Sequence, residues 1–279
     1  MTDEAIALPP RRRPTGTIIV ALALVGGWAL LALFAPLIAP FDPNAVDILN
    51  MLRAPNATHW FGTDQVGRDV LSRVLYASRV DLFLCVAGVV PPLLIGTAVG
   101  LFSGYYGGVV DGLLMRLFDL TAAFPFFVLV LAIVGVIGPG LTNFLIALTL
   151  VGWVTYARLV RAEVLTVRES EYVQAARCLG FPDRAILFRH VLPNAFGPVI
   201  AYGVSDAVLV MLAGASFGFL GMGAQPPLAE WGVMIADGQA FVRQAPWICV
   251  FPGLAAISLG LGLAFLGDAL GQLQRRQAT

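Results

Sequence analysis

The sequence LFLCVAGVVPPLLIGTAVGLFSGY, residues 82–105, contains no charged side chain. An α-helix needs about 20 mainly apolar residues to cross a hydrocarbon layer roughly 30 Å thick, so this stretch predicts a membrane-spanning helix. On either side of it, five more apolar runs predict spans, namely 17–39, 120–137, 141–156, 199–222 and 248–266. We therefore expect an all-α, polytopic membrane protein with six transmembrane helices.

The composition of the 279-residue chain supports this fold class and excludes several kinds of chemistry. Apolar residues make up 58% of the chain and charged residues 12%, whereas a soluble domain has about 25% charged residues. All 17 basic residues are arginine, which excludes a P-loop lysine and a Schiff-base lysine. The 3 cysteines and 2 histidines show no spacing typical of a metal site or a disulfide framework. We expect no metal, no cofactor and no catalytic centre.

Arginine is unevenly distributed between the two sides that the six spans define. With the N-terminus inside, 12 arginines fall on the inner side and 5 on the outer side. Because cytoplasmic segments near span ends are enriched in positive charge, both termini are expected to be cytoplasmic. The expected division of the chain is a cytoplasmic tail at 1–16, a first transmembrane helix at 17–39, an extracytoplasmic loop at 40–81, a five-helix core at 82–268 and a cytoplasmic tail at 269–279.

Small and kinking residues recur inside the spans. Gly96-x-x-x-Gly100, Gly100-x-x-x-Gly104 and Gly214-x-x-x-Gly218 each place two glycines on one helix face, which lets helix backbones approach closely. Pro91-Pro92 and Pro125 are expected to kink their helices, since proline removes an intrahelical hydrogen bond.

The longest polar interruption of the inner side, 158–194, predicts a helix, a glycine turn and a second helix. Ser170 suits an N-cap, and Tyr172, Ala175, Ala176 and Leu179 share one apolar face until Gly180 ends the helix. A second short helix is expected from Pro182 until Pro193 stops it. With both alanines on its exposed side, this hairpin suits docking of another protein. The residues alone leave that interpretation open beside an amphipathic linker lying on lipid headgroups.

The outer loop, 40–81, is predicted to contain an interfacial helix that leads into the second span. Asp64 is expected to cap it, and Asp64/Arg68 and Asp69/Arg73 are i, i+4 pairs in the favourable orientation. We expect these charges to form a solvated face of the helix.

Asp206 is the carboxylate expected at membrane depth, within the fifth span. A charge near the centre of a spanning helix costs about 2.5 to 3.5 kcal/mol on insertion scales, so it usually faces a cavity or a partner. Two interpretations stay open, a pathway or gate residue and a structural acid that is hydrogen-bonded to a neighbouring helix or partly protonated.

Three motifs resemble one protein family. The first motif is Glu171-Tyr172-Val173-Gln174-Ala175-Ala176-Arg177-Cys178-Leu179-Gly180, followed by Arg189-His190-Val191-Leu192-Pro193-Asn194. It is similar to the EAA motif of bacterial ABC importer permeases, and its ending is similar to that of the dipeptide, oligopeptide and nickel branch. The second is residues 59–73, HWFGTDQVGRDVLSR, and the third is residues 219–227, FLGMGAQPP, with Glu230-Trp231-Gly232. Two departures are that Gln174 stands where the family usually has Glu, and that residues 269–272 replace the usual Arg-Asp continuation.

The resemblance implies a type I ABC importer permease fold and a coupling role for the hairpin, which in this family inserts into the ATPase subunit. The coupling residues it implies are Glu171, Tyr172, Gln174, Ala175, Ala176, Gly180, His190 and Pro193. The implied partners are a second homologous permease, two ATP-binding ATPase subunits, an extracytoplasmic substrate-binding protein and membrane lipid, with no nucleic acid. The implied location is the bacterial cytoplasmic (inner) membrane.

The expected function is that of a non-catalytic permease subunit that moves dipeptides or oligopeptides by alternating access. One alternative is a permease for nickel or another small solute, since the separate binding protein largely selects the cargo. A different class, an ion-coupled secondary transporter, usually has several ionisable groups near the midplane and inverted repeats. This sequence shows neither feature.

Overall fold

The computed structural model describes residues 15–277, and this part of the chain is helical without a β-sheet. The predicted N-terminal tail, 1–16, falls almost wholly outside these residues, whereas residues 269–277 of the predicted C-terminal tail continue the last helix. The α-helices are α1 (Thr15–Ile38), α2 (Val70–Tyr106), α3 (Gly108–Ala122), α4 (Phe126–Ile137), α5 (Leu141–Val167), α6 (Glu171–Cys178), α7 (Asp183–Ile186), α8 (Leu192–Phe219), α9 (Trp231–Gln239) and α10 (Trp247–Gln277). The all-α prediction is confirmed.

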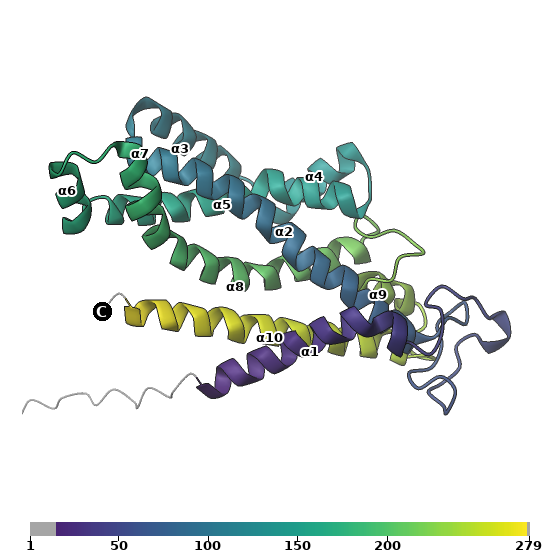
Figure 1. Ribbon diagram of the computed structural model, residues 1–279. Helices are drawn as coiled ribbons and strands as arrows, with labels where there is room; N and C mark the ends of the chain where they lie inside the picture. Colours follow the sequence, from purple (N-terminus) through teal and green to yellow (C-terminus); the bar gives the residue numbers. More distant parts are fainter. Residues whose placement is uncertain (1–14, 278–279) are drawn as a thin grey trace, which may run out of the picture.

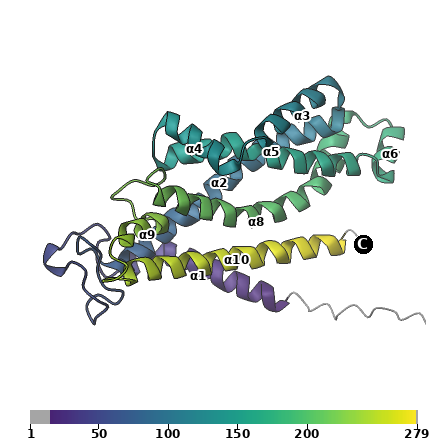
Figure 2. The ribbon, with the colours of Figure 1, turned by 180° about the vertical axis from the view of Figure 1, so that it is seen from behind.

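The long helices α1, α2, α5, α8 and α10 run the length of an elongated bundle (Figures 1 and 2). The helices α6 and α7 lie at one end, towards which the start of α1 and the end of α10 also point. We call this the hairpin end. The segment between α1 and α2, together with α9, lies at the opposite end, which we call the loop end.

Five helical stretches are long and apolar enough to cross a membrane, and a bent pair makes the number up to six. The bent pair is α3 and α4, which meet at 88° where a single span over 120–137 was predicted. Pro125 lies at this break with φ −58° and ψ 130°, because a residue without an N–H cannot continue the helical hydrogen bonds. The predicted kink is thus a complete interruption, whereas Pro91 and Pro92 stay inside a continuous α2.

The contact between α2 and α5 is the most extensive in the bundle, and glycines make it possible. A Cβ at Gly96 would lie 2.5 Å from the carbonyl oxygen of Trp153, and one at Gly100 would lie 2.4 Å from that of Ala157. Gly104 continues the same face against Arg161 and Val164. The predicted close approach of backbones is therefore confirmed for this pair of motifs.

The loop end contains buried charges where a solvated helix face was expected. No helix starts at Asp64. Asp64, Asp69 and Arg73 are each at most 3% exposed, and α2 begins only at Val70 with Asp69 as its N-cap. Arg68 Nε donates to Asp64 Oδ2 at 2.6 Å from a loop, and Arg73 Nε lies 3.8 Å from the same oxygen. The sequence interpretation was wrong because it treated the spacing as helical, whereas Gly67 at φ +81° turns the chain back on itself.

This loop is tied to distant helices of the chain. The Arg68 guanidinium reaches Asp237 of α9 at 3.5 Å, and the Trp247 indole donates to the Thr63 carbonyl oxygen at 3.0 Å. Glu230 caps α9 by accepting hydrogen bonds from the N–H groups of Gly232 and Val233 at 2.7 and 2.9 Å. Glu230 is fully buried, and this burial raises the pKa of its carboxyl group. The loop end is therefore a packed structure and not a flexible connection.

We expect Gly100→Val to disrupt the α2–α5 contact, because the added carbons must enter space that the Ala157 carbonyl and the Val160 side chain occupy. Overpacking of this kind costs about 1–3 kcal/mol, so the midpoint of thermal unfolding in detergent is expected to fall by several degrees. Gly112→Val on α3 is the matched control, since a Cβ there meets nothing within 4 Å. Equal midpoints for the two variants would contradict the packing argument.

Candidate functional site

The hairpin, residues 170–193, begins with the short helix α6. Ser170 occupies the N-cap position without a side-chain capping bond, and its hydroxyl donates instead to the Val167 carbonyl at 2.6 Å. Glu171 in the first turn and Arg177 in the last turn complement the helix dipole. Gly180 ends the turn at φ +76°, where the Phe181 N–H donates to the Ala176 carbonyl at 3.2 Å. A left-handed residue at this position is typical of glycine.

The two alanines of α6 lie on different faces. Val173 and Ala176 are 0% and 5% exposed and pack into the bundle. Ala175 is exposed, as are Tyr172 at 45% and Leu179 at 77%. The expectation of two outward-facing alanines is corrected here, because one face of this two-turn helix has to bury apolar area against α7 and the bundle. The exposed apolar side chains here are therefore Tyr172, Ala175 and Leu179.

The second arm of the hairpin does not end at Pro193. After α7, a π-helical turn, Leu187–Val191, leads without a break into α8. In this turn the Leu192 N–H donates to the Leu187 carbonyl, one residue further back than in an α-helix. Pro193 is the second residue of α8, and the π-helical turn directly before it accommodates a residue without an N–H inside the continuous helix. The hairpin is thus joined rigidly to a membrane-spanning helix.

Three contacts hold the hairpin and the end of α5 against the end of α2. The Tyr105 hydroxyl donates to Asp183 Oδ1 at 2.8 Å. The Arg168 guanidinium donates to the Gly104 carbonyl at 2.8 Å, and the Arg177 guanidinium lies 5.6 Å from the centre of the Tyr105 ring. Sequence reasoning missed Tyr105 and Arg168, because Tyr105 and Asp183 are 78 positions apart and no local pattern connects them.

The other predicted residues of the hairpin have identifiable surroundings. The Gln174 amide, exposed on α6, donates to the Glu169 carbonyl at 2.9 Å. The His190 ring lies edge-on to Phe181 at 6.1 Å, and its buried Nε2 atom has no hydrogen-bond partner among the described residues. Glu171, Tyr172 and Gln174 are exposed, so the structure presents them at the surface together with Ala175 and Gly180.

Asp206 lies away from the hairpin, in the middle of α8. Its Oδ2 atom accepts a hydrogen bond from the Tyr156 hydroxyl of α5 at 2.7 Å. The carboxylate also lines a cavity of about 480 Å³ between α2, α4, α5 and α8. Asp206 therefore has a feature of each interpretation that the sequence left open, a bond to a neighbouring helix and a position on a cavity.

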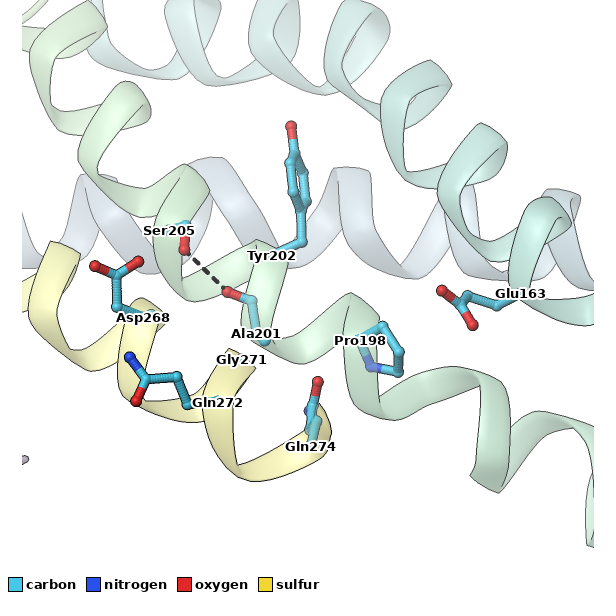
Figure 3. A pocket seen from close by; sticks show the side chains of 10 residues that line it. Glu163, Pro198, Ala201, Tyr202, Ser205, Asp268, Gly271, Gln272 and Gln274 are labelled. Carbon is cyan, nitrogen blue, oxygen red and sulfur yellow. Dashed lines mark hydrogen bonds between the residues drawn. The ribbon is translucent and has the colours of Figure 1, made fainter. Parts of the chain in front are cut away.

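A second cavity of about 600 Å³ lies nearer the hairpin end, between α5, α8 and α10 (Figure 3). Its polar side chains include Glu163, Ser205 and Gln274, and Tyr202 lines both cavities. The Tyr202 ring points away from α10 and lies 5.3 Å from the Tyr156 ring, centre to centre. Within residues 15–277, no group of three or more His, Cys, Asp or Glu side chains could hold a metal ion.

A bundle of membrane-length helices with a small, firmly held helical hairpin at one end has the architecture of a polytopic membrane protein. The chain matches the family described as "Binding-protein-dependent transport system inner membrane component" over residues 96–278. It belongs to this family, and it is the permease subunit of an ATP-driven ABC importer of the bacterial inner membrane.

Three relatives are similar over nearly the whole chain. The dipeptide transport system permease protein of Alkalihalophilus pseudofirmus is 40% identical over 90% of this chain and 83% of its own length. The probable D,D-dipeptide transport system permease protein of Escherichia coli is 38% identical, with 93% and 85% covered. The oligopeptide transport system permease protein of Bacillus subtilis is 36% identical, with 91% and 82% covered.

We expect Tyr105→Phe to loosen the hairpin without unfolding the bundle. The variant keeps the ring beneath Arg177 and loses only the hydrogen bond to Asp183. Loss of one such bond costs about 1 kcal/mol, which corresponds to roughly fivefold faster amide exchange in α6 and α7. Tyr106→Phe is the control, because the Tyr106 side chain is 59% exposed. The measurement is hydrogen–deuterium exchange in lipid nanodiscs, and unchanged protection in Tyr105→Phe would contradict the anchoring role.

Proposed function

We propose that this subunit carries dipeptides or oligopeptides across the membrane by alternating access, powered through its hairpin. The observation that carries the proposal is the exposed α6 face of Tyr172, Ala175 and Leu179 on a hairpin continuous with α8. An ATPase subunit that closes on this face would displace α8 as a rigid lever. The named cargo of the similar proteins, dipeptides and oligopeptides, supports peptide as the substrate class.

The energy source in this proposal is a pair of separate ATPase subunits, and the chain itself performs no catalysis. It contains no lysine and so cannot form the phosphate-binding lysine of a P-loop. An extracytoplasmic binding protein delivers the peptide at the loop end. A ligand with equal affinity for two states does not change their populations. In the proposal, nucleotide binding to the ATPase subunits therefore supplies the difference in free energy between the inward-open and outward-open states.

A second, homologous permease covers the face formed by α4 and α8 in this assembly. Large apolar side chains are exposed there, including Phe127, Leu209 and Leu212, and the cavity that contains Asp206 lies among them. A charged carboxylate beside a lipid-exposed surface has an unfavourable free energy, whereas the same carboxylate between two permeases faces protein or water. No feature of the described residues favours the nickel or the ion-coupled alternative.

The proposal places the hairpin and both termini in the cytoplasm, and a native cysteine allows a direct test. Cys178 is exposed on α6, whereas Cys85 is buried. In membranes that lack the ATPase subunits, an impermeant maleimide is expected to label Cys178 in inside-out vesicles and not in intact spheroplasts. Trp60→Cys, at an exposed position of the loop end, is expected to show the opposite pattern. Labelling of Cys178 from outside would overturn the orientation and the proposed energy coupling.

We expect Gly180→Val to reduce co-purification of the ATPase subunits at least several-fold while membrane insertion stays normal. Gly180 has φ +76°, and a side chain in the left-handed region costs about 1–2 kcal/mol, so the turn and the α6 surface rearrange. Gly221→Val is the matched control, since Gly221 has φ +73°, equally open space around it and a position near the loop end. Normal ATPase recovery with Gly180→Val would contradict docking at the hairpin.

A further inference from the structure

Within residues 15–277, Asp206 has no basic partner, as is also true of the buried Asp81 and Glu230, whereas Asp111 and Asp64 each have one. Asp111 pairs with Arg161 at 2.6 Å and Asp64 pairs with Arg68 at 2.6 Å. Asp206 has only the Tyr156 hydroxyl, on Oδ2, and none of the described residues donates a hydrogen bond to Oδ1. None of the residues that line its cavity carries a positive charge. The remaining oxygen of the carboxylate is thus left to a group from outside the subunit.

Apart from Asp206, Thr155 and Tyr202, the residues that line this cavity are apolar. Gly88, Pro92 and Gly152 keep the α2 and α5 walls thin, and Phe126, Phe127 and Leu209 contribute hydrophobic surface. The volume of about 480 Å³ lies in the range of roughly 300–1,000 Å³ that is typical of small-molecule pockets. The site therefore suits a solute with one positive charge on a partly apolar body.

The polar groups of this cavity suit a protonated amine better than a metal ion. A hard metal ion requires about six or more oxygen ligands, and no group of three candidate ligands exists in the described part of the chain. A protonated amine needs only one carboxylate, and aromatic rings can add cation–π attraction. Tyr202 provides such a ring on the cavity wall, and the buried Tyr156 ring packs 5.3 Å from it, centre to centre.

Tyr202 also connects this cavity to the second one. It lines both, so a solute that moves from Asp206 into the second cavity, where Ser205 and Gln274 are among the lining residues, passes Tyr202. Figure 3 shows Tyr202 and Ser205 of α8 at the second cavity, across from Asp268, Gln272 and Gln274 of α10.

We propose that the Asp206 carboxylate binds the protonated α-amino group of a peptide during transport, with Tyr156 orienting the carboxylate. This inference rests on the proposed peptide import and deepens it by naming the part of the substrate that the permease recognises. Delivery by the binding protein loads the peptide, and the single charge contact at Asp206 holds it while the helices change orientation.

The test uses the full complex with its binding protein in proteoliposomes and a dipeptide without charged side chains, alanylphenylalanine, as the probe. Asp206→Asn keeps the size of the side chain and removes its charge. We expect uptake to fall about tenfold or more, as for loss of a charged hydrogen bond, while ATP hydrolysis stimulated by the binding protein stays within about twofold. Asp206→Glu, which retains the charge, is expected to keep most of the uptake. Asp119→Asn is the control, because Asp119 is an exposed carboxylate paired with Arg158 at 3.1 Å.

The outcomes separate this inference from the proposed function. Wild-type uptake by Asp206→Asn would overturn the amine site and leave peptide import intact, and a parallel loss of uptake and ATP hydrolysis would assign Asp206 to the conformational change instead. No uptake by the wild-type complex would overturn peptide import and the amine site with it. Should Asp206→Asn fail to assemble, Asp206→Ser, which is smaller and also uncharged, takes its place with the same expected result. If neither Asp206→Asn nor Asp206→Ser assembles, Asp206 has a structural role and the inference is overturned.

Discussion

The close contact of α2 with α5 is the constraint on which the rest of the molecule depends. In a lipid environment no hydrophobic effect drives helices together, so association relies on packing at short range. Gly96, Gly100 and Gly104 provide that packing along one face of α2. The same contact fixes the end of α2 where Tyr105 and the Gly104 carbonyl hold the hairpin, and it fixes Tyr156 on α5 opposite Asp206. Hairpin and cavity are therefore positioned by one interface.

The π-helical turn links these two regions mechanically. A loop between α7 and α8 would absorb displacement of the hairpin, whereas the continuous helix transmits it to α8. Asp206 and Tyr202 lie on α8, so in the proposed mechanism these two cavity residues move with the hairpin while Tyr156 stays on α5. A shift of α8 relative to α5 changes the hydrogen bond between Tyr156 and Asp206. In this way, a movement driven by the ATPase subunits would alter the carboxylate that is proposed to bind the substrate.

The sequence predicted the helices and the hairpin well because both depend on local patterns. Apolar runs, the glycine at 180 and the glycine repeats of α2 each act within a few residues. The loop end was predicted poorly, because Asp64 and Arg68 show helical spacing, but contacts with Asp237 and Trp247 decide the local conformation. The break at Pro125 and the continuity at Pro193 show the same limit. Proline removes one donor in both places, and only the surrounding structure determines whether the chain bends or widens into a π turn.

The long-range contacts of the loop end also have a consequence for biogenesis. Residues 39–69 leave the ribosome early, but their partners Asp237 and Trp247 belong to the last third of the chain. The segment must therefore remain without these partners until the later helices have been synthesised. In the proposed orientation it waits on the extracytoplasmic side, so folding of the loop end is completed outside the lipid, when the first translocated segment packs against the last.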